Sequence, residues 1–240
     1  MSRKIIIRAF RAVDEPERCI EYIQGHLEVL KIFNVENVTS ANPEWTENPG
    51  AYVVVAEDVE TGEILGGIRM HKASYTHNLP IEEAVCAMDI RVINLVRKSM
   101  TDGAGELCGL WNSRKVKGLG LSTILTRVGI AITSQIGIKT VFGVCADFTL
   151  SMLKSVGYVM EKSLGNQGCF PYPTTEYNCN AIIIHDAHQL NNADPQVRDI
   201  IFDLRARPVH RDNETGAFLI NFELLINYSR ATHMGTHTSQ

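Results

Sequence analysis

The 240-residue sequence predicts a mixed α/β fold, in which helices flank a central mixed sheet on both faces. Between Glu106 and Lys162 the pattern alternates as strand, helix, strand, helix and strand, which is typical of such layers. Two apolar runs, Tyr52–Ala56 and Ile64–Met70, are joined by a turn at Val59–Glu63 and indicate an antiparallel hairpin. Hydrophobic residues make up 45% of the chain and charged residues 21%, so the chain can bury a large core.

A strand, a long helix and a loop are predicted before this hairpin, at Ile5–Phe10, Asp14–Ile32 and Asn34–Gly50. The helix carries apolar residues at helical spacing, namely Ile20, Ile23, Leu27 and Leu30. After the hairpin, the segment Pro80–Met100 is predicted to be partly helical, because proline suits the first turn of a helix.

The centre of the chain has the clearest pattern. A strand at Glu106–Trp111 and a polar loop at Asn112–Lys117 lead into an apolar helix, which opens at Gly118-Leu-Gly120 and continues to about Ile136. Gly137 suits the end of that helix. Further strands are predicted at Thr140–Cys145, Tyr158–Lys162 and Ala181–His185, and a short helix at Phe148–Val156.

The chain is predicted to divide near residue 190. Residues 1–190 form the main domain, and residues 191–240 form a C-terminal extension of a helix and an apolar strand segment packed on it. The last part of this extension, which contains His233 and His237, is polar and is expected to be a mobile tail.

Composition excludes several function classes. The 23 basic and 27 acidic residues give a net charge of −4, which argues against nucleic-acid binding over a broad surface. No run of 18 apolar residues exists, so no membrane span is expected. The six cysteines contain no C-x-x-C pair, so we expect free thiols in a cytoplasmic protein and no metal site.

The loop before the central helix is a candidate anion site. Gly118 and Gly120 allow phosphate oxygens to approach the backbone at the helix start, and Arg114, Lys115 and Lys117 supply positive charge. A simple helix entry with solvated lysines explains the same residues. No G-K-[ST] follows, which excludes a Walker loop, and a dinucleotide fingerprint is disfavoured because its third glycine falls on Thr123.

The order of these elements resembles the GNAT N-acyltransferase superfamily. The family's loop pattern [QR]-x-x-G-x-[GA] corresponds to Lys115-Val-Lys-Gly118-Leu-Gly120, and its later turn corresponds to Gly157-Tyr158. The resemblance implies that an acyl-coenzyme A donor is bound, through residues Leu110, Trp111, Arg114, Lys115, Val116, Lys117, Gly118, Leu119, Gly120 and Leu121. Gly109 is then either the bulge at which the strand splays or a packing glycine.

A second resemblance narrows the superfamily to one branch. The segment Gly62-Glu-Ile-Leu-Gly-Gly-Ile-Arg69-Met and the strand beginning at Glu106 are similar to the acyl-homoserine-lactone synthases and the long-chain N-acyl amino acid synthases. Arg69 and Glu106 match the pattern, while Cys108 and Gly109 replace its Ser/Thr and Arg. The resemblance implies an amine or amino acid acceptor, and the phosphopantetheine of an acyl carrier protein as an alternative donor.

Four residue types are weighed as site residues. Glu106, a carboxylate at the start of an apolar strand, is the candidate general base acting through a water, or else a solvated first residue. Arg69 is either the ligand of a substrate carboxylate or an exposed strand arginine. His71 has the chemistry of a proton shuttle, although a strand-end histidine explains it as well. Cys108 and Cys145 are expected to be inert.

Tyr158 is the candidate acid, because the family's usual tyrosine position corresponds to Leu153. The leaving thiolate is expected to depart unassisted or to take a proton from Tyr158 or water. The loop Cys169–Tyr177 is a candidate lid of the acceptor or acyl pocket. The predicted function is therefore transfer of an acyl group from a thioester to an amine. A non-catalytic acyl-coenzyme A-binding module and another nucleotide-phosphate binder are the alternatives.

Overall fold

The computed structural model describes residues 4–32, 43–211 and 218–224. The strands are β1 Ile5–Arg11, β2 Ala51–Asp58, β3 Ile64–Lys72, β4 Ala104–Asn112, β5 Thr140–Ala146, β6 Val159–Met160, β7 Cys169–Pro171, β8 Asn178–Ile184, β9 Val209–Arg211 and β10 Phe218–Asn221. The helices are α1 Pro16–Ile32, α2 Pro80–Val85, α3 Arg91–Ser99, α4 Leu121–Ala131, α5 Thr133–Ile136, α6 Asp147–Ser155 and α7 Pro195–Ala206. Short 3-10 turns lie at Ala12–Asp14, Pro43–Glu47, Met100–Asp102 and Arg114–Val116.

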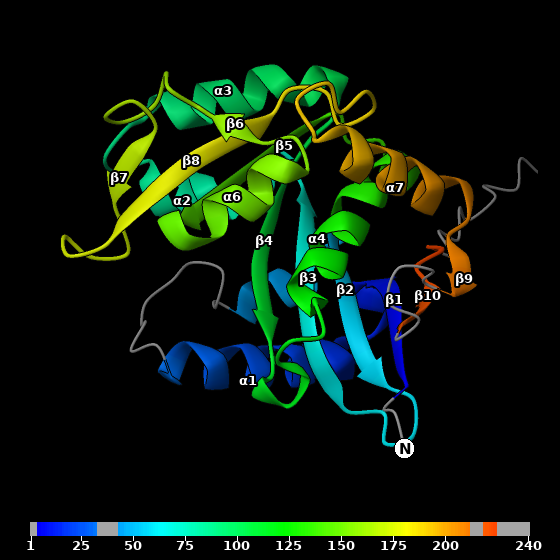
Figure 1. Ribbon diagram of the computed structural model, residues 1–240. Helices are drawn as coiled ribbons and strands as arrows, with labels where there is room; N and C mark the ends of the chain where they lie inside the picture. Colours follow the sequence, from blue (N-terminus) through cyan, green and yellow to red (C-terminus); the bar gives the residue numbers. More distant parts are fainter. Residues whose placement is uncertain (1–3, 33–42, 212–217, 225–240) are drawn as a thin grey trace, which may run out of the picture.

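All ten strands belong to one mixed sheet, in the order β6-β8-β5-β4-β3-β2-β1-β10-β9, with β7 beside β8. Strands β1 to β4 are antiparallel neighbours, whereas the β4–β5 and β1–β10 pairs are parallel. Helices α1 and α4 cover opposite faces of the sheet (Figure 1). The predicted fold class, a GNAT-like mixed sheet with helices on both faces, is confirmed.

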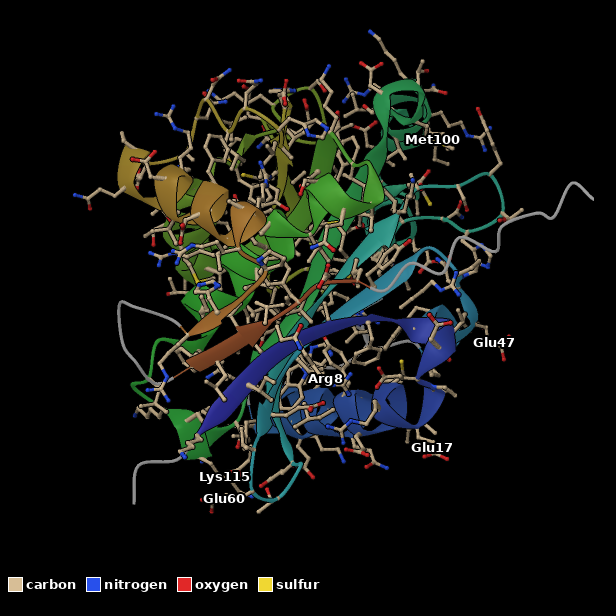
Figure 2. The ribbon with its side chains drawn as sticks, turned by 90° about the vertical axis from the view of Figure 1, so that its right-hand side faces the viewer. Arg8, Glu17, Glu47, Glu60, Met100 and Lys115 are labelled. Atoms are coloured by element: carbon tan, nitrogen blue, oxygen red, sulfur yellow. The ribbon has the colours of Figure 1, made fainter. Side chains whose placement is uncertain are left out.

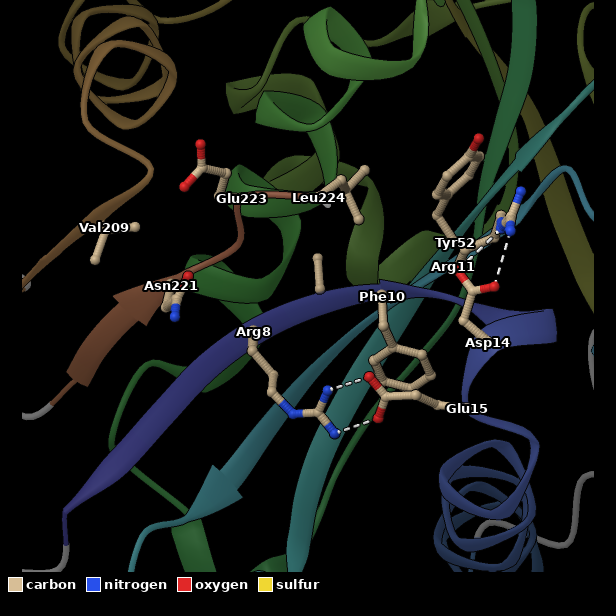
Figure 3. A pocket seen from close by; sticks show the side chains of 11 residues that line it. Arg8, Phe10, Arg11, Asp14, Glu15, Tyr52, Val209, Asn221, Glu223 and Leu224 are labelled. Carbon is tan, nitrogen blue, oxygen red and sulfur yellow. Dashed lines mark hydrogen bonds and ion pairs between the residues drawn. The ribbon is translucent and has the colours of Figure 1, made fainter. Parts of the chain in front are cut away.

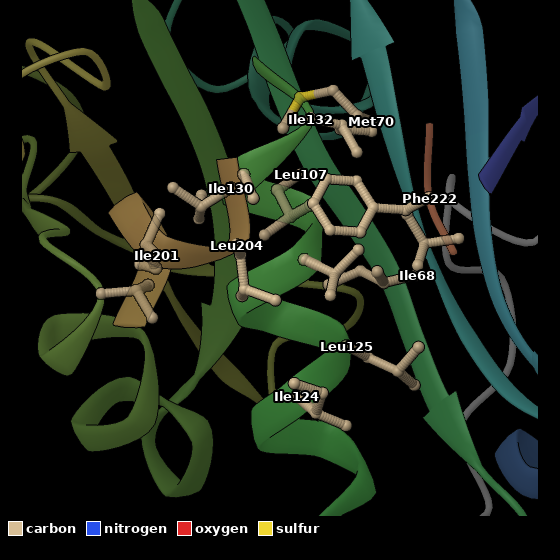
Figure 4. Packing of buried hydrophobic residues seen from close by; sticks show 14 of the residues in the cluster. Ile68, Met70, Leu107, Ile124, Leu125, Ile130, Ile132, Ile201, Leu204 and Phe222 are labelled. Carbon is tan, nitrogen blue, oxygen red and sulfur yellow. The ribbon is translucent and has the colours of Figure 1, made fainter. Parts of the chain in front are cut away.

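The larger core lies between the sheet and α4. Leu125 and Ile130 of α4 are fully buried, and they pack in one cluster with Ile68 and Leu107 of the sheet (Figure 4). The spacing that predicted this helix is the spacing of its buried face. The predicted single helix is divided at Ile132, where the Thr133 and Ser134 hydroxyls donate to the carbonyls of Ile130 and Ala131.

Two of the four aliphatic residues at helical spacing on α1 are exposed. Ile20 is 54% exposed and Leu27 is 39% exposed, whereas Cys19, Tyr22 and His26 face the sheet. The sheet surface under α1 is mixed, because it carries the aliphatic Val53, Val55 and Ile64 together with the aromatic Trp111. Tyr22 contacts both the Trp111 ring and the Arg69 guanidinium, and aliphatic periodicity does not detect such a residue.

Two other elements differ from the prediction. The strand expected at Tyr158–Lys162 contains only Val159–Met160, because β8 pairs with these two residues and then pairs with β7 instead. The segment Cys169–Tyr177, expected to be a loop, begins with β7. None of the described helices is both long enough and apolar enough to span a membrane.

The C-terminal extension contacts the rest of the fold in two places. Strands β9 and β10 join the sheet beside β1, and α7 packs on α4. Arg205 of α7 donates to the carbonyls of Ala187 (2.6 Å) and Ile130 (3.3 Å) and to the Thr133 hydroxyl (3.3 Å). The domain division at residue 190 remains a prediction, and the predicted mobile tail lies outside the described residues.

Replacing Arg205 with Met keeps its apolar stem but removes the donors for these partly buried carbonyls. We expect Arg205→Met to lower the free energy of unfolding by about 2 kcal/mol in urea titrations. Arg207→Ala, at the C-terminal cap of the same helix, is the control, because its ion pair with Asp203 is solvent-exposed, and no resolvable loss is expected. Equal losses in the two variants would contradict a specific contribution from Arg205.

Candidate active site

Strand β4 contains a bulge at Gly109. Arg69 pairs with Cys108 and Gly67 pairs with Trp111, so Gly109 and Leu110 together lie opposite Ile68. Gly109 has a φ of 65°, and a Cβ there would lie 2.9 Å from the Tyr22 hydroxyl and 3.0 Å from Arg69 Nε. Glycine is therefore required at position 109 for two reasons, the backbone of the bulge and the close packing against Tyr22 and Arg69. The bulge and the packing glycine, which the sequence left as alternatives, are both present.

Immediately before the bulge, β4 separates from β5. The parallel pairing covers only Ala104–Glu106 against Thr140–Phe142, and Figure 1 shows β4 diverging from β5 and β8 beyond it. The backbone of β4 after Glu106 therefore faces a gap between the strands. No described strand pairs with this part of β4 on the side of β5.

Glu106 lies at the point where the strands part. Its side chain is buried, and its carboxylate accepts a 2.6 Å hydrogen bond from the backbone N–H of Ile81 at the start of α2. Burial raises the pKa of Glu106 to about 8, and the nearby Glu82 and Glu83 carboxylates add to this shift, while the Ile81 N–H and Arg69 oppose it. The alternative of a solvated first residue is thus wrong.

Arg69 is fully buried on the same face of the sheet, two strand positions from His71. Its guanidinium carbon lies 4.1 Å from the ring centroid of Trp45 and 5.6 Å from that of Tyr22, and its Nη2 lies 3.8 Å from Cys108 Sγ. Arg69 is therefore not an exposed strand arginine. It supplies a buried positive charge within the electrostatic reach of Glu106.

His71 pairs directly with Glu106 across β3 and β4. It is 3% exposed, and its ring centroid lies 6.2 Å from that of Trp45. Burial and the positive charge of Arg69 lower the pKa of His71 well below 6.5, so the imidazole is neutral at physiological pH. Burial also raises the pKa of the neighbouring Cys108 thiol to about 12, as expected for an inert cysteine.

Three aromatic side chains close this face of the sheet. Tyr22 of α1 lies between Trp45 and Trp111, with ring centroids 5.7 and 5.8 Å away, and its hydroxyl donates to the Gly109 carbonyl. The Trp111 ring packs so closely on Gly25 of α1 that a Cβ there has no room. Trp111 therefore presents its backbone, and not its indole ring, to the gap beside β5.

Tyr158 lies on the other face of the sheet, in the core that includes α4. Its hydroxyl donates to the Phe142 carbonyl at 3.2 Å, on the residue of β5 where pairing with β4 ends. Burial raises the pKa of Tyr158 well above 10, and the Glu106 charge acts in the same direction. The Tyr158 hydroxyl thus lies where the β4–β5 pairing ends, on the opposite face of the sheet from Glu106.

The glycine loop lies at the far end of β4, about 20 Å from Glu106 at the usual rise per strand residue. Gly118 and Gly120 have φ values of 84° and 71°, and a Cβ on either would meet no atom within 4 Å. Figure 2 shows Lys115 next to the β2–β3 turn that carries Glu60, and its ammonium is paired with Glu63 at 2.6 Å.

The remaining residues of this loop have different environments. Val116 is buried in the α4 core and anchors the loop, while Leu119 is 38% exposed. Arg114 and Lys117 are exposed and make no ion pair with another described residue. The open side of the loop therefore combines glycine backbone, two unpaired cations and the first amides of α4, whose N–H groups point out of the helix.

A separate depression of about 550 Å³ lies at the edge of β1, far from these residues (Figure 3). Its two arginines are already paired, Arg8 with Glu15 and Arg11 with Asp14. It contains none of the residues predicted from the sequence. Among the described residues, no three His, Cys, Asp or Glu side chains lie together in a way that would hold a metal ion.

The parted strands, the bulge and the open glycine loop also describe a fold that other proteins share. No protein-family model and no curated protein sequence matches the chain. Solved structures share its fold, among them FeeM, an N-acyl amino acid synthase from uncultured soil microbes. FeeM has 11% sequence identity and a TM-score of 0.57, and the match covers 82% of this chain and 99% of that one.

Two acyl-homoserine lactone synthases also share the fold, with somewhat lower TM-scores. LasI has 12% identity and a TM-score of 0.53, with coverage of 78% of this chain and 92% of its own. The CoA-dependent synthase BjaI, solved with SAM and isopentyl-CoA, has 13% identity, a TM-score of 0.51 and coverage of 85% and 90%. The resemblance identified from sequence motifs is thus confirmed at the level of the fold.

The structure brings Arg69, Glu106 and the β4 backbone together on one face, with the glycine loop at the end of the same strand. Sequence reasoning missed Tyr22 and Trp45, whose roles depend on contacts between segments far apart in the chain. The Tyr22–Gly109 hydrogen bond, for example, joins residues 87 positions apart. The only local signal was the spacing of Cys19, Tyr22 and His26 on α1, which is helical but not aliphatic.

Proposed function

We propose that the protein is an N-acyltransferase that moves an acyl group from an acyl thioester to an amine or amino acid acceptor. One observation carries the proposal: β4 leaves β5 directly after a buried carboxyl group, and the same strand ends in an open, cationic glycine loop. The two features are about 20 Å apart. An extended donor with an anionic end and a thioester end, such as acyl-coenzyme A or carrier-protein phosphopantetheine, has this form.

Each candidate residue then has a distinct task. The loop from Arg114 to Leu121 holds the phosphates, and the backbone of Leu110 and Trp111 binds the thioester arm and stabilises the oxyanion. Glu106 takes the proton that the attacking amine must lose, and Arg69 faces an anionic group of the acceptor. Tyr158 or water protonates the leaving thiolate.

The proposal is tested by incubating the protein with acetyl- and long-chain acyl-coenzyme A and a pool of amino acids. Release of free thiol together with an N-acyl product is the expected result, with mass spectrometry identifying the acceptor. Donor binding without thiol release would instead favour a non-catalytic acyl-coenzyme A-binding module. Absence of both would exclude the proposed donor.

We also expect the enzyme to prefer acyl groups longer than acetyl. Residues after Gly157, including Leu164, Phe170 and Ile183, form an apolar cluster with α2 and α3 next to Glu106's partner Ile81. Each methylene buried against such a surface contributes up to about 0.8 kcal/mol, or about fourfold in kcat/KM. Measuring kcat/KM from two to ten carbons tests this, and a flat or falling series contradicts it.

A further inference from the structure

A buried histidine lies beside the candidate base and has no task in the proposed function. His71 pairs with Glu106 in the β3–β4 register, and residues paired in this way project to the same face with Cβ atoms about 5 Å apart. The imidazole and the carboxyl group are both buried. His71 Nε2 has no hydrogen-bond partner among the residues that the structure describes.

A buried imidazole nitrogen without a hydrogen-bond partner lowers the stability of the folded protein. A buried polar nitrogen without a partner loses its hydration and gains no hydrogen bond, at a cost of about 1–3 kcal/mol. His71 is not needed to fill the space, because an aliphatic residue would pack against Trp45 without this cost. An unsatisfied nitrogen next to an ionisable carboxyl group is instead suited to receive a proton from a third group.

We propose that His71 carries the proton from the acceptor amine to Glu106, in the position that the sequence analysis gave to a water. This inference rests on the proposed acyl transfer and adds a second catalytic residue to it. The direction of transfer follows from the environments of the two groups. Protonated His71 is a stronger acid than Glu106, because burial lowers the pKa of the imidazole and raises that of the carboxyl group.

The amine nitrogen attacks the thioester carbon and forms the C–N bond, while a ring nitrogen of His71 takes the N–H proton and passes it to the ionised carboxylate of Glu106. The C–S bond breaks with its electron pair on sulfur, and the thiolate takes a proton from water or Tyr158. Glu106 then returns the proton to water, which restores both residues.

The charged and titratable groups that face the pair come from four elements. They are Arg69 on β3, Cys108 on β4, Cys19, Tyr22 and His26 on α1, and Glu82 and Glu83 on α2. Burial raises the pKa values of Tyr22 and of the Cys19 and Cys108 thiols and keeps these groups neutral. Glu106 is therefore the group whose ionisation switches the relay on as the pH rises.

A double-mutant cycle tests the relay. His71→Asn keeps a polar side chain but removes basicity, and we expect it to lower kcat by about 10²-fold while leaving donor affinity unchanged in calorimetry. The double variant His71→Asn/Glu106→Gln is expected to be no slower than the slower single variant, because the two residues act on one proton. His26→Asn is the matched control, a buried histidine whose ring packs edge-on against that of Tyr22, and its kcat should stay within twofold of wild type.

The outcomes separate the two proposals. Normal kcat in His71→Asn, or losses that multiply in the double variant, would overturn the relay while leaving acyl transfer intact. An equal loss in His26→Asn would show that disturbing α1 packing is the cause, which also overturns it. Absence of acyl transfer by the wild-type protein would refute the proposed function itself.

Discussion

Glu106→Gln is expected to lower kcat for acyl transfer by about 10²-fold while changing donor affinity by less than twofold. The amide keeps the shape of the side chain, but it accepts no proton from an amine that must be neutral to attack a thioester. An amine with a pKa near 10.4 is only about 0.04% neutral at pH 7, so the loss of the proton acceptor falls on the chemical step. Steady-state kinetics and calorimetry with the donor separate the two effects.

The pH dependence gives the same prediction a second readout. With the pKa of Glu106 raised to about 8, roughly a tenth of the carboxyl groups are ionised at pH 7. We therefore expect kcat at saturating substrates to rise about tenfold between pH 7 and 9 in the wild-type protein and to be flat in the variant. A variant that turns over normally across this range would make Glu106 a structural residue.

Whereas kcat is expected to rise with pH, the contribution of Glu106 to the stability of the folded protein is expected to fall. The pKa of Glu106 is higher in the folded than in the unfolded protein, so its contribution is fully present below pH 4.5 and is lost as the pH rises through about 8. Glutamine carries no charge at any of these pH values. The variant is thus expected to melt at a higher temperature than wild type at pH 8.5, with the difference shrinking towards pH 4.5.

Gly120→Glu is expected to weaken donor binding by at least tenfold, or about 1.4 kcal/mol. Gly120 precedes α4 directly and has open space around its Cα, so the new carboxylate would occupy the position of the donor's phosphates and repel them. Calorimetric titration with acyl-coenzyme A measures the effect. Unchanged binding in a folded variant would remove the loop from the donor site.

Two controls isolate the charge from the backbone strain. Gly120 has a φ of 71°, so Gly120→Ala introduces the strain without the charge, and its effect should appear in unfolding rather than in binding. Gly137, with a φ of 67°, lies at the other end of the α4–α5 segment, and Gly137→Glu adds the same charge away from the loop. Donor affinity within twofold of wild type is expected for both.

How much the sequence predicts depends on whether an element is specified locally. The helix α4 was predicted because its buried residues are aliphatic and recur with the helical period, and the hairpin of β2 and β3 because its turn is short. The bulge was indicated by one glycine in an apolar strand. In each case neighbouring residues carry the whole signal.

The site required contacts that no local pattern specifies. The buried residues of α1 are Cys19, Tyr22 and His26, and they pack on a mixed sheet surface that includes Trp111, so they do not follow the aliphatic pattern. Trp45 stacks on Arg69, from a separate 3-10 turn, and His71 was ambiguous until Glu106 was found opposite it. These pairings come from tertiary structure, where the chemistry of the site departs from ordinary core packing.

The parallel pairing of β1 with β10 affects the order in which the protein can mature. Ile5 pairs with Phe218, about 200 residues later, so the apolar strand Ile5-Ile6-Ile7 leaves the ribosome long before its outer neighbour exists. At typical elongation rates of about 5–20 residues per second, this edge stays uncovered for roughly 10–40 s. During that interval it can pair with other nascent chains, so chaperone dependence in cells is the expected consequence of pairing β10 with β1.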